Sequence, residues 1–265
     1  MALLRWLAVL LVGVAVLQSQ VVGRSLFQDN GDDGTDDGDD DMEMPEEVEG
    51  PKESDVPCST DVTYEVLNAC DWSEDKFPRD YPSSSAHWSP LCGTAHNENY
   101  SMWDVGQIST EGVRIVAEIG DHGTLEEEVQ ACIDAGNCSA FYEWGCSTFS
   151  GTCDHAGTID MSGDYPYVSL LSMIAPSPDW MTGVSSAKLC GPGGNWTSEY
   201  KRDLGGYDAG TDSGPSYTSP DDATDPFEPI FALNATDESN LLYNVDEGKL
   251  YPVCTITFTL STDDP

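Results

Sequence analysis

The sequence predicts a mainly β protein, an antiparallel β-sandwich with one or two helical insertions. Apolar and polar residues alternate near both ends of the folded region, an apolar run of strand length lies in its middle, and only one stretch has a clear helix start. The 265 residues leave room for one substantial domain plus tails, because single hydrophobic cores stop growing at roughly 250 to 300 residues.

The expected strands follow from period-two patterns. In residues 62–66 and again in residues 254–260, apolar side chains alternate with polar ones, which is typical of half-buried strands. Residues 167–174 form a nearly continuous apolar run that ends before Pro176. A run of this length and composition fits a central strand buried on both faces.

Helices are expected in one region only. Thr124 and Glu127 form a capping box, which predicts a helix start. Leu125, Val129, Cys132 and Ile133 fall on one face of that helix, and a shorter helix is expected over residues 112–119. The stretch 191–229 is rich in Pro, Gly and Asp, so we expect long loops there.

The N-terminal residues predict export. Residues 1–23 combine an early Arg5, a short apolar stretch and small residues at the end, the pattern of a secretory signal peptide. Residues 24–55 are dominated by Asp, Glu and Gly, so we expect an acidic disordered segment. The folded domain is placed at 56–265, in a secreted, extracellular protein with no membrane span.

The charge balance restricts the partners. Ten Lys and Arg stand against 48 Asp and Glu, a formal net charge of -38. Such a surface repels phosphate backbones. Nucleic-acid binding is therefore excluded, while cations, basic partners and neutral polar ligands remain.

Nine cysteines follow the signal sequence, and no two are spaced as Cys-x-x-Cys. Disulfides are the expected state in an exported chain, with one thiol left over. Four of the cysteines lie close enough in sequence to cross-link one local subregion through disulfides: Cys132, Cys138, Cys146 and Cys153. Cys70 and Cys92 are equally plausible partners for Cys254.

Four acceptor sequons for N-glycosylation occur, at Asn99, Asn137, Asn195 and Asn234. Each is plausible in an exported protein. The surroundings of Asn234 favour it most, since Asp and Ser suggest an exposed loop.

No catalytic motif supports an enzyme, and no catalytic residue is assigned. His155 lies next to Asp154 with Ser147 and Ser150 nearby, but adjacency in sequence is not the geometry of a triad. The alternative to a binding protein is a secreted glycan-acting enzyme that uses two of the many carboxylates as a pair.

Three stretches carry a family resemblance. They are Phe-Pro-Arg-Asp-Tyr-Pro at 77–82 with Trp-Ser-Pro-Leu-Cys-Gly at 88–93 and Asn-Tyr-Ser-Met-Trp at 99–103, Ser-Met-Ile-Ala-Pro-Ser-Pro-Asp-Trp at 172–180, and Tyr-Asp-Ala-Gly-Thr-Asp-Ser-Gly at 207–214. Together they resemble the spondin domain family of F-spondin and mindin. The resemblance runs from about Tyr64 to Pro226, and the strand up to Leu260 fits the family's closing strand.

The resemblance implies a C2-like sandwich, with Ca²⁺ held by Asp179, Asp208 and Asp212 and a disulfide between Cys58 and Cys190. It also implies an extracellular matrix or cell-adhesion module whose partner is a matrix or cell-surface protein or glycan. We expect a stand-alone spondin domain, because the chain lacks the thrombospondin-type repeats of F-spondin and mindin. It contains no Arg-Gly-Asp tripeptide, so an integrin role is not assigned through that motif.

The chemistry of the aspartates agrees with a metal site, because Ca²⁺ takes six to eight oxygen ligands in flexible geometry. The competing interpretation is that Asp208 and Asp212 cap turns in a Gly-rich loop.

Overall fold

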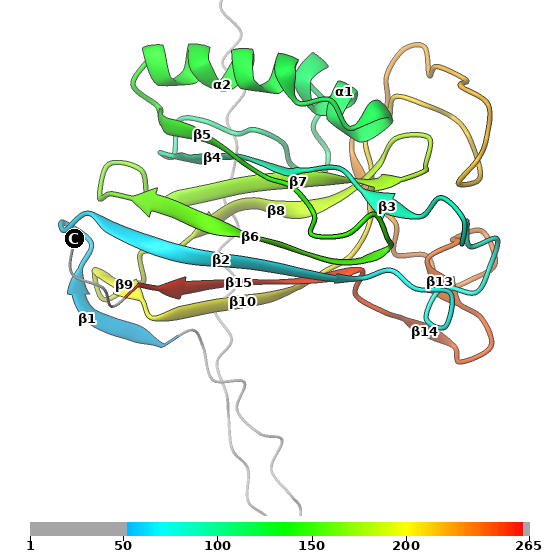
Figure 1. The fold of residues 1–265 in the computed structure, drawn as a ribbon. Coiled ribbons are helices and arrows are strands. Elements are labelled where there is room, and N and C mark those ends of the chain that lie inside the picture. Colours follow the sequence, from blue (N-terminus) through cyan, green and yellow to red (C-terminus); the bar gives the residue numbers. More distant parts are fainter. Residues whose placement is uncertain (1–51, 262–265) are drawn as a thin grey trace, which may run out of the picture. The chain divides into compact units, whose positions relative to one another are not determined.

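Two antiparallel sheets packed face to face frame the part of the chain that the computed structural model describes, residues 52–261 (Figure 1). The predicted β-sandwich with helical insertions is therefore confirmed. The expected signal peptide, 1–23, and residues 24–51 of the expected acidic segment lie outside the described residues.

The smaller sheet holds the strands that the sequence patterns predicted at both ends of the domain. Its order is β10 (Glu199–Leu204), β15 (Cys254–Leu260), β2 (Val62–Asp71) and β6 (Thr152–Met161). Alternate residues are buried from Tyr64 to Cys70 in β2 and from Cys254 to Phe258 in β15. The apolar side chains among them form the core between the two sheets.

The larger sheet carries the predicted central strand. Its order is β12 (Phe231–Ala232), β11 (Tyr207–Asp208), β8 (Trp180–Lys188), β7 (Tyr167–Ala175), β4 (Leu91–His96) and β5 (Cys138–Trp144), and β3 (His87–Trp88) also pairs with β7. All residues of β7 after Tyr167 are buried, because the second sheet covers one face and the helices cover the other (Figure 1).

Two short pairs complete the fold, β1 (Glu53–Pro57) with β9 (Asn195–Thr197) and β13 (Tyr243–Asn244) with β14 (Lys249–Leu250). They lie at opposite ends of the sandwich (Figure 1). Because β1 begins at Glu53 and pairs with β9, the folded domain starts before the boundary predicted at 56. Residues 53–55, expected to be disordered, belong to this strand.

The stretch 191–229 is less irregular than predicted, since it contains β9, β10 and β11. The reason is the exposure of β10, which lies at the edge of its sheet and keeps Glu199, Lys201, Arg202 and Asp203 exposed. An edge strand of this kind lacks the apolar alternation by which strands are recognised in a sequence.

Helices α1 (Glu111–Ile119) and α2 (Gly123–Asp134) cover the outer face of the larger sheet (Figure 1). The shorter predicted helix is confirmed as α1, capped by the Thr110 hydroxyl. The predicted capping box of α2 is wrong. Its N-cap is His122, which makes no side-chain cap, and the Asp121 carboxylate accepts from the Gly123 N–H at 2.8 Å. That contact starts the helix earlier than Thr124.

Four disulfides join eight cysteines: Cys58–Cys190, Cys70–Cys254, Cys132–Cys138 and Cys146–Cys153. The first is the pairing that the family resemblance implied. Cys70 and Cys254 lie directly opposite each other on β2 and β15, whereas Cys92 on β4 is a buried free thiol. Residues 52–261 contain no helix long and apolar enough to cross a membrane.

Candidate metal centre

The three aspartates that the sequence singled out lie at one end of the larger sheet. Asp179 comes directly before β8, Asp208 is the last residue of β11, and Asp212 follows in the next loop. Because β11 pairs with β8 so that Asp208 lies opposite Trp180, the strand pairing brings Asp179 and Asp208 to the same edge. The structure thus gathers residues from two separate sequence motifs.

Asp179 is the most buried of the three, with 0% of its surface exposed. Its Oδ2 accepts from the N–H groups of Thr211 at 2.7 Å and Asp212 at 3.1 Å, and from the Thr211 hydroxyl at 3.2 Å. Its Oδ1 is also buried but has no hydrogen-bond partner. An unpaired buried carboxylate oxygen is costly, so this atom needs an explanation.

Asp208 and Asp212 both cap turns, as the competing interpretation held. The Asp208 Oδ1 accepts from the Gly210 N–H at 2.9 Å, and the Asp212 Oδ1 accepts from the Gly214 N–H at 2.8 Å. Gly210 has φ +75° and lies so close to the Glu228 carbonyl that a Cβ would be 2.1 Å from that oxygen. A carboxylate has about four lone-pair positions, so capping a turn does not exhaust either side chain.

The electrostatics of this group are unfavourable without a cation. Burial, followed by the nearby charge of Asp179, raises the pKa of Asp208 to about 7. Burial also raises the pKa of Asp179, although hydrogen bonds from Thr211 and Asp212 oppose the shift. The charged forms are therefore disfavoured by both desolvation and mutual repulsion.

Helix α1 adds a fourth carboxylate, Glu118. Burial raises its pKa, while Thr211 and Arg114 lower it and the charge of Asp179 raises it further. Arg114 is paired with both Glu111 and Glu118, so its charge is shared between two carboxylates. No sequence pattern pointed to Glu118, because it lies far from the three aspartates along the chain. Thr211 lies inside the Asp-Ala-Gly-Thr-Asp motif, but the motif alone does not reveal that Thr211 donates hydrogen bonds to Asp179.

The donor set fits a hard divalent cation such as Ca²⁺, which prefers carboxylate and carbonyl oxygens. The three aspartates are not drawn tightly together: among the described residues, only Cys146, Cys153 and His155 have ligand atoms that all lie within 4.8 Å of one another. Two oxygens on opposite sides of a calcium ion lie about 4.6–5.2 Å apart, twice the usual bond length, so a shared ion requires the three carboxylates to come within that limit.

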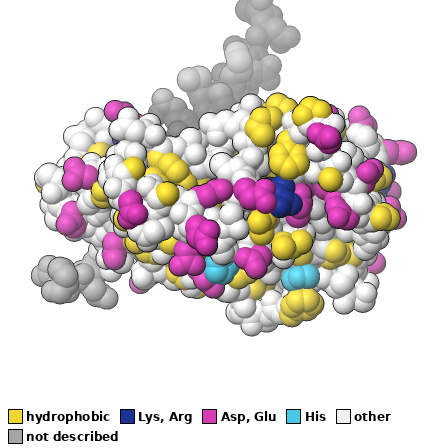
Figure 2. Space-filling view, turned by 90° about the horizontal axis from the view of Figure 1, so that it is seen from above, with side chains coloured by type: hydrophobic (Ala, Val, Ile, Leu, Met, Phe, Trp, Pro, Cys, Tyr) yellow, Lys and Arg dark blue, Asp and Glu magenta, His cyan; other side chains and the backbone are white. Residues whose placement is uncertain are grey.

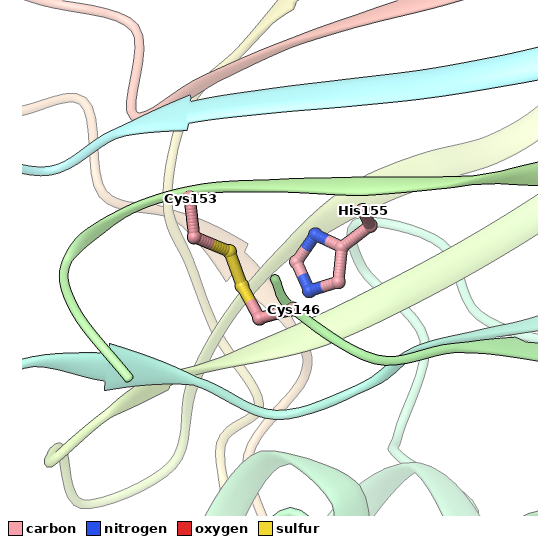
Figure 3. A group of neighbouring side chains, drawn as sticks. All are labelled: Cys146, Cys153 and His155. Atoms are coloured by element: carbon pink, nitrogen blue, oxygen red, sulfur yellow. A yellow bond between two sulfur atoms is a disulfide. The ribbon is translucent and has the colours of Figure 1, made fainter. Parts of the chain in front are cut away.

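The compact group of Cys146, Cys153 and His155 is not itself suited to a metal (Figure 3). The two sulfur atoms are bonded to each other, and only a free thiolate is a good ligand. The His155 Nε2–H donates to the Ser89 carbonyl at 2.9 Å, and its Nδ1 accepts from the Asn68 amide at 3.3 Å. Both ring nitrogens are thereby occupied, and burial lowers the pKa of His155.

The enzyme alternative finds no support in this geometry. His155 faces Ser89 and Asn68, so it forms no triad with Ser147, Ser150 and Asp154. An apolar cavity of about 120 Å³ lies between β11, β12 and β14, smaller than the roughly 300–1,000 Å³ of typical ligand pockets. Its lining contains no Asp, Glu or His: Gly205, Gly206, Tyr207, Ala232, Leu233, Asn234, Leu242, Leu250 and Tyr251.

The four sequons differ in exposure. Asn99 and Asn234 are exposed, whereas Asn137 and Asn195 are half-buried. The Asn137 side chain accepts from the Asn97 amide at 3.2 Å, and Thr197, the hydroxyl residue of the Asn195 sequon, is buried. Glycan attachment stays a prediction, and the geometry favours Asn99 and Asn234.

Comparison with known proteins identifies the family. The Spondin_N family model matches residues 62–252, which include every strand from β2 to β14 and all three aspartates. Spondin-2 of Homo sapiens is 33% identical over 207 residues, covering 76% of this chain and 62% of that protein.

Two spondin-1 proteins are similar as well. That of Gallus gallus is 33% identical over 194 residues, covering 72% of this chain, and that of Rattus norvegicus is 34% identical over 204 residues, covering 75%. The chain spans only 24% and 25% of the length of these two proteins. With the family model matched over most of its length, the chain belongs to the Spondin_N family.

Proposed function

We propose that the chain is a secreted, calcium-stabilised spondin-domain protein that acts as a non-catalytic binding module of the extracellular matrix or cell surface. The observation that carries the metal is the Asp179 Oδ1, buried without a hydrogen-bond donor beside Asp208, whose pKa is raised to about 7. A dication placed there pairs the orphaned oxygen and relieves the repulsion between the carboxylates.

The ion's role is to hold the loops together rather than to take part in chemistry. Asp179 precedes β8, while Asp208 and Asp212 bracket the turn after β11. A cation shared between them ties the end of one strand to the loop that follows another. A ligand that binds only the folded state adds to its stability by mass action.

Thermal unfolding of the full chain in Ca²⁺ and in a chelator tests this proposal. Extracellular calcium sites bind at about 10⁻⁴ to 10⁻³ M, and saturation at about 100 times the dissociation constant adds about 2.7 kcal/mol. For a domain of this size that corresponds to a rise of about 5–10 °C in the melting temperature.

Three variants locate the ion. Asp179→Asn, Asp208→Ala and Asp212→Ala should each abolish most of the calcium-dependent shift. Asp203→Asn is the matched control, since Asp203 is exposed on β10, where its carboxylate accepts from the Thr255 hydroxyl. Equal calcium shifts in the wild type and the three site variants would refute the site. An equally small reduction of the shift in Asp203→Asn and in the three site variants would indicate diffuse binding to the acidic surface.

A further inference from the structure

An exposed apolar patch lies beside the carboxylate loop. It is formed by Val105 and Ile108, in the segment before α1, by Phe227, in the loop before β12, and by Phe231, the first residue of β12. These side chains are 52%, 52%, 38% and 44% exposed, respectively. Exposed apolar side chains scattered singly are ordinary, but a contiguous group rimmed by polar residues marks an interaction site.

Backbone pairing brings the two segments together. The Gly106 N–H donates to the Ile230 carbonyl at 2.8 Å, and the Ile230 N–H donates to the Gln107 carbonyl at 2.8 Å. Ile108 also forms a β-bridge with Pro229. Ile230 is 1% exposed and belongs to the core beneath the helices, so the patch is anchored on a buried residue.

The charges around the patch are of one sign. Segments 104–111 and 221–231 contain six Asp and Glu residues and no Lys, Arg or His. Arg114, the next cation along the chain, is paired with Glu111 and Glu118. On the helix-bearing face, hydrophobic side chains lie among acidic ones, and Lys or Arg is rare (Figure 2). Such a rim repels anionic surfaces and a second copy of this acidic chain, and it attracts cations.

We propose that Val105, Ile108, Phe227 and Phe231 form a docking surface for a basic protein segment, one that presents Lys or Arg beside apolar side chains. The apolar side chains of the partner pack on the patch, and its cations face the acidic rim. This inference rests on the proposed binding role, for which it names the surface and the class of partner, but it does not require the metal.

The probe is a fluorescently labelled synthetic peptide of repeated Leu-Lys-Lys-Leu units, titrated with the full chain and followed by anisotropy. We expect it to bind the wild type at least tenfold more tightly than it binds the double variant Ile108→Ser, Phe231→Ser. A thermal melt checks that this variant folds. Val105→Ser alone, at the edge of the patch, should weaken binding to a smaller extent.

Phe149→Ser is the matched control. Phe149 is 78% exposed and stacks on the His87 ring at 4.1 Å, within the loop that the Cys146–Cys153 disulfide closes. The substitution removes an even more exposed aromatic side chain outside the patch and should leave binding unchanged. A second control peptide with Ser in place of Leu keeps the charge and should bind at least tenfold more weakly.

Three results would overturn the docking surface. The first is that Phe149→Ser loses as much peptide binding as the double variant. The second is that the wild type binds the Ser-containing peptide as tightly as the Leu-containing one. The third is that phosphatidylcholine vesicles bind through the patch while the peptide does not bind. If one of these appears while the calcium shift of the wild type persists, the docking surface is wrong and the metal-held module stands. If the wild type shows no calcium shift but binds the peptide through the patch, the metal site is wrong and the docking surface stands.

Discussion

Two regions of this domain bury polar groups by different means. Around the Cys146–Cys153 disulfide, burial lowers the pKa of His155, and both of its ring nitrogens are hydrogen-bonded, to Ser89 and Asn68. At the end of the larger sheet, Asp179 is buried with one oxygen unpaired and a second carboxylate nearby. In the first region both imidazole nitrogens are paired within the chain and the neutral Asn68 Oδ1 lacks a donor, whereas in the second the unpaired oxygen belongs to a carboxylate beside another carboxylate. Under the proposed function, the carboxylate region should therefore depend on an added cation, and the region around His155 should not.

The largest expected effect comes from breaking the Cys70–Cys254 disulfide, which adjoins the first region because Cys70 lies opposite Cys153 on β6. Replacing both Cys70 and Cys254 by Ala removes a bridge between residues 184 apart in sequence, which should destabilise the domain by about 2–5 kcal/mol. Denaturant unfolding measures the loss. The calcium-dependent shift should persist in this variant, because the disulfide joins β2 to β15 in the smaller sheet, whereas the aspartates lie at the end of the larger one. Loss of the calcium shift would show that the two regions are not independent.

Gly210→Ala should break the carboxylate region from within. Its φ of +75° and the 2.1 Å approach of a Cβ to the Glu228 carbonyl combine left-handed strain with a backbone clash, for a cost of about 2–4 kcal/mol. Gly136→Ala is the control, because Gly136 also has φ +75° but open space around its Cβ. It should cost about 1 kcal/mol. Equal losses in the two variants would argue against the close packing of the loop.

The pH dependence of stability should differ between the regions when metal is absent. Asp208 has its pKa raised to about 7 by burial, so the folded state binds more protons than the unfolded state between about pH 4 and pH 7. Its contribution to stability therefore falls as pH rises through this range. Burial lowers the pKa of His96 and His155. Their contribution to stability is therefore lost as pH drops below about 6.5, the opposite dependence to that of Asp208.

Asp208→Asn isolates the first of these contributions. In chelator, this variant should be more stable than the wild type at pH 8, and the difference should shrink towards pH 5. Melting temperatures across pH 5–8 measure it. Parallel curves for the two proteins would show that Asp208 is not perturbed by burial.

The smallest effects are expected at the exposed sequons. Asn99→Gln and Asn234→Gln should each remove one glycan mass from the secreted protein while changing stability by less than about 0.5 kcal/mol. Mass spectrometry of the intact protein gives the first quantity and thermal melts give the second. An unchanged mass in either variant would mean that exposure alone does not determine occupancy.

Local patterns in the sequence determined much of the frame. The alternation in residues 62–66 and 254–260 and the apolar run at 167–174 predicted strands that the structure contains, because burial of one or both faces imposes those periods on a strand. The family resemblance singled out the three aspartates. Strand β10 escaped prediction because its exposed edge position lets charged side chains occupy most of the strand.

Only the tertiary structure decided which distant residues meet. Cys70 rather than Cys92 pairs with Cys254 because the register of β2 and β15 places their Cα atoms 3.9 Å apart, a distance that no spacing along the chain reveals. Likewise, Glu118 reaches the aspartate loop from helix α1, and Ile108 and Pro229 form one bridge. Periodicity records whether a side chain is buried, whereas partners are set by sheet register and packing, which are properties of the whole fold.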